Sequence, residues 1–161
     1  MVTVFATLFA LLPADALAAG STLETETFAN NSTGAGQWYL PAGEGGTNGA
    51  CLTAGPVSAT TSIPNCPSPP DTSGSGALRL TTNAGNAVGA AFYQASLPTT
   101  EGLDLTLDTY QYNGTGADGI VFTLAAANPA SPTPPSTTGP LGGDLGYAAN
   151  TQGSRGWLRR G

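Results

Sequence analysis

The chain has 161 residues, of which only 9% are charged, against about a quarter in an ordinary globular protein. This length predicts one domain with room for a core. The net charge of -6 argues against nucleic acid as a partner, because binding phosphates requires a basic surface.

The first stretch, MVTVFATLFALLPADALAAG, is predicted to be a signal peptide. Its apolar run is too short to span a bilayer, which needs about twenty residues, and Pro13 ends it. Ala16-Leu17-Ala18 has the small-x-small pattern of a signal-peptidase site. We therefore expect residues 1–18 to be removed and the protein to be secreted and extracellular, with no membrane span left. A buried N-terminal helix is the alternative.

The remaining sequence favours short strands joined by long turns, because 23 Gly and 13 Pro interrupt any helical pattern. No segment keeps helical periodicity over three turns. Strand patterns occur, in chain order, at residues 22–28, 76–82, 88–97, 103–112 and 120–126, the last one apolar enough for burial on both faces, and a further strand is expected to begin in 142–150. These patterns predict an all-β fold, an antiparallel sandwich or jelly roll.

Cys51 and Cys66 are the only cysteines, and they bracket a loop rich in Pro, Ser and Thr. In an oxidising compartment such a pair is expected to form a disulfide. Closing a loop of this size would stabilise the fold by about 3 kcal/mol. A metal site is the weaker alternative, because two cysteines without any His supply too few ligands.

Few side chains are suited to catalysis, and we expect no enzymatic activity. The absence of His excludes a Ser-His-Asp triad. Asp104 and Asp108 would share a strand face about 13 Å apart, whereas glycosidase carboxylates lie about 5 to 5.5 Å or about 6.5 to 9.5 Å apart. Glu24 and Glu26 are better spaced, at about 6.6 Å, but stand near the mature N-terminus without a third acid. A β-sandwich glycosidase is thus a disfavoured alternative.

Asp118 is the carboxylate that needs an explanation, because it stands in the glycine-rich turn NGTGADG directly before the apolar run IVFTL. Its generic role is to stabilise its own turn by accepting backbone N–H groups, and general principles alone favour that role. The functional alternative is that it accepts hydrogen bonds from two neighbouring sugar hydroxyls. An aromatic face for the sugar could come from Trp38, Tyr110, Tyr112 or Tyr147.

The stretch LDLTLDTYQYNGTGADGIVFTLAAANP, followed by GPLGGDLGY, resembles the legume-type (L-type) lectin domain, closest to its bacterial secreted members. GACLTAG…NC and GSGALRLT resemble the same members, so the likeness runs from about Phe28 to Tyr147. It implies a concanavalin A-like jelly roll with a shallow sugar site at one edge. In that site Asp118, preceded by a cis peptide, would accept bonds from the hydroxyls of an oligosaccharide or cell-surface glycan, and Gly143 would offer its backbone N–H.

The resemblance also implies calcium, and possibly manganese, held by an Asn and acidic residues of a later strand. No such strand precedes Gly161, so the metal ligands are unknown and we expect a partial sandwich over residues 19–147. Residues 148–161 form an atypical Arg/Gly tail, either a genuine basic tail or the product of a reading-frame slip. A lectin-like module is therefore predicted, with a structural or adhesive β-sandwich without sugar binding, or an incomplete gene product, as the alternatives.

Overall fold

The computed structural model describes residues 22–34, 37–43, 48–55, 62–100, 102–116, 118–125 and 135–145. Within these ranges the chain is all-β, as predicted. The described strands are short pairs, and a 3-10 turn follows them. They are β1 (Trp38–Tyr39), β2 (Cys51–Leu52), β3 (Ala54–Gly55), β4 (Asp71–Thr72), β5 (Leu78–Arg79), β6 (Phe92–Tyr93) and the 3-10 turn η2 (Gly142–Asp144). The predicted signal peptide and the Arg/Gly tail lie outside the described residues.

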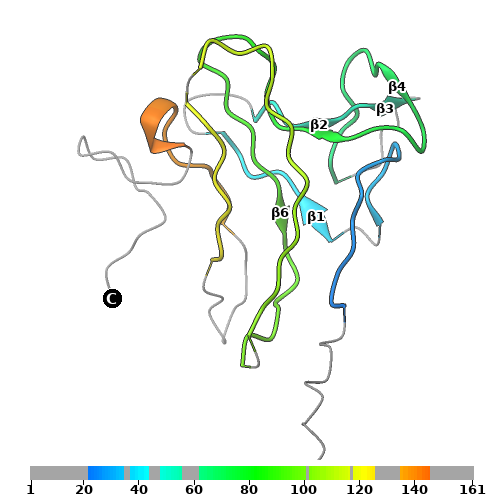
Figure 1. Ribbon diagram of the computed structural model, residues 1–161, viewed down its shortest axis with the longest axis vertical. Helices are drawn as coiled ribbons and strands as arrows, with labels where there is room; N and C mark the ends of the chain where they lie inside the picture. Colours follow the sequence, from blue (N-terminus) through cyan, green and yellow to red (C-terminus); the bar gives the residue numbers. More distant parts are fainter. Residues whose placement is uncertain are drawn as a thin grey trace, which may run out of the picture.

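The strand pairs are nested along the chain. β3 pairs with β4, β2 pairs with β5 outside them, and β1 pairs with β6 outermost. The chain from β1 to β3 therefore runs out, and the chain from β4 to β6 returns beside it, so that the connection between β3 and β4 is the innermost one (Figure 1). The two outer pairs are antiparallel, whereas β3 and β4 are parallel. A parallel pair needs a connection of about a dozen residues or more, which the segment between Gly55 and Asp71 supplies.

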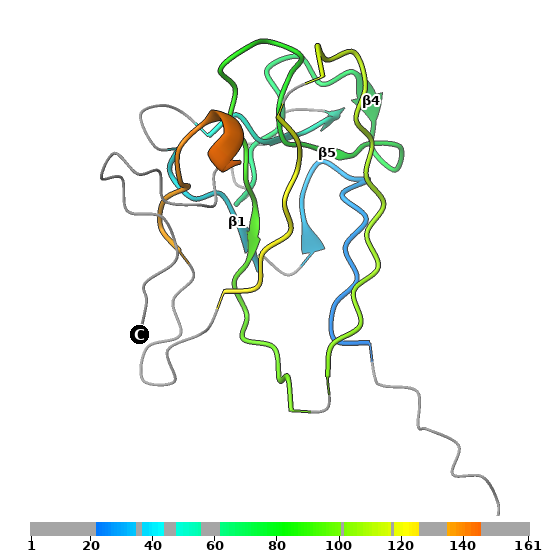
Figure 2. The ribbon, with the colours of Figure 1, turned by 60° about the vertical axis from the view of Figure 1, so that its left-hand side comes forward.

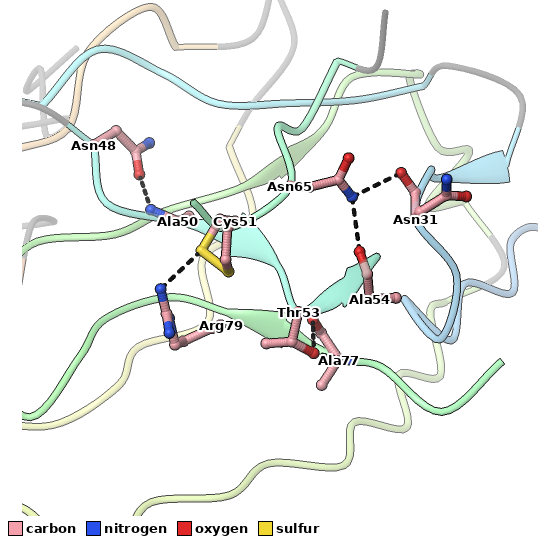
Figure 3. Close-up of a disulfide and its surroundings, with 10 residues drawn as sticks. Asn31, Asn48, Ala50, Cys51, Thr53, Ala54, Asn65, Ala77 and Arg79 are labelled. Carbon is pink, nitrogen blue, oxygen red and sulfur yellow. Dashed lines mark hydrogen bonds between the residues drawn. A yellow bond between two sulfur atoms is a disulfide. The ribbon is translucent and has the colours of Figure 1, made fainter. Parts of the chain in front are cut away.

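The core lies around a disulfide. Cys51 and Cys66 are bonded, with their Cα atoms 5.0 Å apart, so the predicted disulfide is confirmed. Leu52 and Ile63 are fully buried beside it, and Ala54 continues the buried run along β3. The small core and the disulfide thus hold the two ends of the predicted loop together, and Figure 3 shows the residues around the bridge.

Aromatic rings cover both faces of the outermost strand pair. On one face Trp38 packs against Tyr93, with ring centroids 5.5 Å apart, and Phe28 meets Trp38 edge-on at 4.9 Å. On the other face Tyr39 lies 6.1 Å from Phe92. Such ring pairs contribute about 0.5–1.5 kcal/mol beyond the burial of their area. They stabilise a ladder that has only two residues on each strand.

The edge strand predicted at residues 22–28 is not formed. The Glu26 carboxylate accepts hydrogen bonds from the N–H groups of Phe28 and Gly34, both at 2.7 Å. Phe28 has a left-handed backbone, with φ of 54°. The segment therefore bends around Glu26 instead of pairing, because the carboxylate takes up N–H groups that a ladder would use.

Of the strands predicted at 76–82 and 88–97, only the two-residue strands β5 and β6 are present, and those predicted at 103–112 and 120–126 are not formed within the described residues. Residues 103–112 and 118–125 run as long extended segments without a ladder (Figure 2). The prediction that residues 120–126 are buried on both faces was wrong, since Phe122 is 53% and Leu124 69% exposed. Burial on both faces requires a layer on each side, and these side chains have open surface instead.

Candidate functional site

Asp118 follows a segment whose backbone turns tightly. Asn113 and Gly116 have φ of 58° and 100°, and Gly119, directly after the carboxylate, has φ of 143°. Glycine adopts these angles without steric cost, and Asn is among the few other residues that tolerate the left-handed region. The glycine-rich sequence is therefore required by the turn, which leaves Asp118 exposed at the start of the extended segment 118–125.

The η2 turn is the second part of the candidate site. Gly142 opens it with φ of 75°, and Leu145 closes it in a left-handed conformation, donating its N–H to the Gly142 carbonyl at 2.8 Å. The strand expected to begin in residues 142–150 is therefore replaced, over the described residues, by a 3-10 turn. The consecutive glycines explain the difference, because they permit a positive φ at low cost where a strand would need extended backbone.

The two parts lie side by side, although they are far apart in the sequence. A Cβ atom placed on Gly142 would lie 3.9 Å from Oδ2 of Asp118, and one placed on Gly119 would lie 3.7 Å from Cδ2 of Leu145. In Figures 1 and 2 the orange turn accordingly stands next to the yellow segment. A Cβ on Gly143 would meet no atom within 4 Å. The structure thus brings Asp118 next to Gly142, the neighbour of Gly143, at an open surface.

The hydrogen bonding of Asp118 differs from that of a carboxylate which holds its own turn. Among the described residues, no backbone N–H donates to Asp118, whereas two donate to Glu26. A carboxylate offers about four acceptor positions on its two oxygens. Because no described backbone N–H uses the acceptor positions of the exposed Asp118, a ligand with hydroxyl groups could use them.

The aromatic candidates have different environments. Tyr110 and Tyr112 are 81% and 78% exposed, so their rings are open to a ligand. Trp38 is half-buried between Phe28 and Tyr93 and serves the packing of β1 on β6. Tyr147 lies outside the described residues. Of the four aromatic candidates, Tyr110 and Tyr112 are therefore the ones that the described chain exposes, and Phe122, 53% exposed, is a further open ring that was not among them.

The sequence did not reveal the residues that support Asp118 and Gly143. Gly142 and Gly119 let the two segments approach, and Leu145 covers Gly119. The signal that could have found the turn is the G-G pair before an Asp, which is typical of a tight turn at least as much as of a strand. The peptide bond before Asp118 involves a residue outside the described ranges, so the expected cis bond is not tested.

The two other closely spaced candidate carboxylates, Glu24 and Glu26, have different partners. Glu26 is engaged by backbone N–H groups, while Glu24 hydrogen-bonds Tyr93. Burial, this hydrogen bond and the negative charge of Glu24 all raise the pKa of Tyr93, and burial raises the pKa of Tyr39. The two glutamates thus have separate structural partners, which accounts for both carboxylates without a joint role.

The described residues do not by themselves fit a calcium site. Calcium takes six to eight oxygen ligands, several of them usually carboxylates. Within the ranges that the structure describes, no three Asp, Glu, Cys or His side chains converge on one point. Among the described residues, Asp118 and its surroundings therefore offer one carboxylate and backbone groups to a ligand.

No family model, curated protein or solved structure matches this chain. In the part of the chain that the structure describes, no helix has the length and apolar character needed to cross a membrane.

Proposed function

We propose that this protein is a secreted carbohydrate-binding module of the L-type lectin kind, built on a concanavalin A-like jelly roll to which the described strand pairs contribute. The observation that carries the proposal is the position of the exposed Asp118 carboxylate, whose Oδ2 lies 3.9 Å from the Cβ position of Gly142. Secretion rests on the predicted signal peptide, and the disulfide is compatible with it.

The chemistry of the site suits a sugar hydroxyl pair. A carboxylate accepts hydrogen bonds from two adjacent hydroxyls, and bonds to a charged acceptor are stronger than those between neutral groups. Gly143 has open space on its side-chain face, so its backbone can be approached closely, and its N–H would donate to a sugar oxygen. Tyr110 and Tyr112 would supply apolar ring faces for the C–H side of a sugar.

The proposed ligand is an oligosaccharide or a cell-surface glycan, and the protein binds it without transforming it. Calcium, and possibly manganese, would support this site only through ligands outside the residues that the structure describes, since the described acidic residues do not converge. Binding should therefore be measured both with calcium and with chelator. A calcium requirement would locate the metal ligands in the remaining segments.

The test is a glycan array probed with the secreted chain, followed by titration of the best glycan against Asp118→Asn. We expect the substitution to weaken binding at least tenfold, because it replaces a charged acceptor by a neutral one. Asp108→Asn is the matched control, since Asp108 is also exposed and lies on the extended segment before the turn. Equal affinity of Asp118→Asn and the parent chain would overturn the assignment of the site.

A structural or adhesive module is the second candidate. It is favoured by the apolar surface of the extended segments, where Leu105, Tyr110, Phe122 and Leu124 are all more than half exposed. Exposed apolar patches often mark interaction surfaces. A chain that binds no glycan on the array but adheres to cells or surfaces, and loses adhesion in Phe122→Ser, would support this candidate instead.

A further inference from the structure

The surroundings of Arg79 suggest a property of the disulfide that the carbohydrate site does not involve. Arg79 lies on β5 directly opposite Cys51 on β2. Its Nη2 donates to Sγ of Cys51 at 3.2 Å, and Figure 3 shows the guanidinium directed at the sulfur. No carboxylate among the described residues forms an ion pair with Arg79, and its Nε is buried without a hydrogen-bond partner. The positive charge is thus directed at one sulfur of the bridge.

The two sulfurs therefore have different electrostatic environments. A disulfide sulfur is a weak acceptor, whereas a thiolate at the same position would form a full ion pair with the guanidinium. In thiol–disulfide exchange the leaving sulfur departs as a thiolate, and the better-stabilised thiolate leaves faster. Arg79 stabilises a negative charge at Cys51, while Cys66 receives no hydrogen bond from Arg79.

We propose that Cys51–Cys66 is a polarised exchange site, in which an incoming thiol bonds to Cys66 and Cys51 is released as a thiolate paired with Arg79. In this step the attacking thiolate forms a new S–S bond to Sγ of Cys66. The Cys51–Cys66 bond breaks, and its electron pair stays on Sγ of Cys51. A second thiol then attacks the mixed disulfide, which leaves both cysteines reduced and the two external thiols oxidised to their own disulfide.

Burial slows this exchange but does not change which of the two sulfurs is attacked. Cys51 is 5% and Cys66 1% exposed, so the external thiol reaches the bridge only when the region around it opens. Arg79 lies directly opposite Cys51 in the β2–β5 pair, so it stays close to that sulfur for as long as the ladder persists. The preference for attack at Cys66 thus depends on the persistence of β2–β5 during opening.

The first experiment maps the mixed disulfide in the secreted chain. The protein is incubated with limiting glutathione, quenched with acid, alkylated and analysed by peptide mass spectrometry. We expect the glutathione adduct on Cys66 to exceed that on Cys51 at least fivefold, and Arg79→Gln to bring the ratio near one. Arg79→Lys, which keeps the charge, should retain most of the preference. An adduct mainly on Cys51 in the parent chain would overturn the proposal, whether or not Arg79→Gln folds.

The second experiment is a redox titration with oxidised and reduced dithiothreitol between pH 6 and pH 9. Arg79 favours the reduced form once Cys51 ionises, so the parent disulfide should be easier to reduce than that of Arg79→Gln. We expect the two reduction constants to agree at the acidic end and to separate by about tenfold at the alkaline end, equivalent to about 30 mV for two electrons. A purely structural role of Arg79 would give a difference that does not change with pH, and that result would contradict the proposal.

Discussion

The side-chain amide of Asn65 donates to the backbone carbonyl of Ala54 at 3.0 Å, inside the core beside the disulfide. The same Nδ2 donates to the carbonyl of Asn31 at 2.9 Å (Figure 3). One buried amide therefore joins β3, the returning loop and the segment before β1. Because the side chain is only 7% exposed, water does not replace these bonds when they are lost.

We expect Asn65→Ala to lower the free energy of unfolding by about 1–3 kcal/mol, because it leaves the buried carbonyl of Ala54 and the part-buried carbonyl of Asn31 with one donor fewer. Chemical denaturation followed by tryptophan fluorescence measures the change. Ser73→Ala is the matched control, since its hydroxyl donates to Asn30 Oδ1 at 3.0 Å on the exposed surface. Equal losses in the two variants would show that burial does not set the strength of these bonds.

Removing the disulfide should be costly in this chain, because its core is small and surrounds the bridge. The double substitution Cys51→Ala and Cys66→Ala opens a loop of sequence separation 15. We expect a loss of about 3 kcal/mol in the free energy of unfolding. Calorimetry of the parent chain and the double variant, both without reductant, provides the measurement. A melting temperature unchanged by the substitution would mean that Leu52 and Ile63 hold the loop ends without the bridge.

The sequence alone predicted local features well and long-range pairing poorly. The disulfide and the strands at β5 and β6 followed from cysteine number, the predicted export and alternating residues. The parallel pairing of Ala54 with Asp71 did not, because no local pattern records which strand a segment will meet. The alternation in residues 103–112 was real, but alternation predicts a strand only where a partner completes the ladder.

In the candidate site, too, the local feature could be predicted from the sequence and the long-range contact could not. Asp118 was singled out because turns and strands do not require a carboxylate at its position, and this reasoning needs no structure. Its proximity to Gly142 could not be derived from composition or spacing, since it depends on how two distant segments cross. The bend around Glu26 was also missed, because a carboxylate that accepts backbone N–H groups has no periodic signature in the sequence.

Alkaline pH should destabilise the protein through Tyr39 and Tyr93. Burial raises the pKa of both above the ordinary value of 10.0, and Glu24 adds to the shift at Tyr93. The unfolded chain therefore releases these protons at a lower pH than the folded one. Their contribution to stability is fully present below pH 10 and is lost as the pH rises through the folded pKa values.

Denaturation midpoints between pH 8 and pH 12 test this expectation. The decline above pH 10 should be smaller in Tyr93→Phe, which keeps the ring against Trp38 but cannot ionise. In Glu24→Gln the absorbance titration of tyrosinate should shift to lower pH, because the negative charge that opposes ionisation is gone. If Glu24→Gln left the titration unchanged, the contact between Glu24 and Tyr93 would be absent in solution.

Single substitutions of the adjacent glycines of η2 distinguish the stability of the turn from its proposed role in glycan binding. Gly142→Ala should weaken the turn by about 1–2 kcal/mol, because an alanine at φ of 75° is strained. Its methyl group would also stand 3.9 Å from Oδ2 of Asp118. Hydrogen exchange of the Leu145 amide, which donates to the Gly142 carbonyl, reports the loss directly and should become faster.

Gly143→Ala should leave the turn intact and weaken glycan binding. Its added methyl group meets no atom within 4 Å, and its φ does not lie in the left-handed region, so the exchange rate of the Leu145 amide should stay that of the parent chain. The methyl group would nevertheless occupy the space through which a sugar must approach the Gly143 N–H. Glycan affinity should therefore fall in Gly143→Ala although the turn is intact. Unchanged affinity in this variant would place the ligand on another side of Asp118.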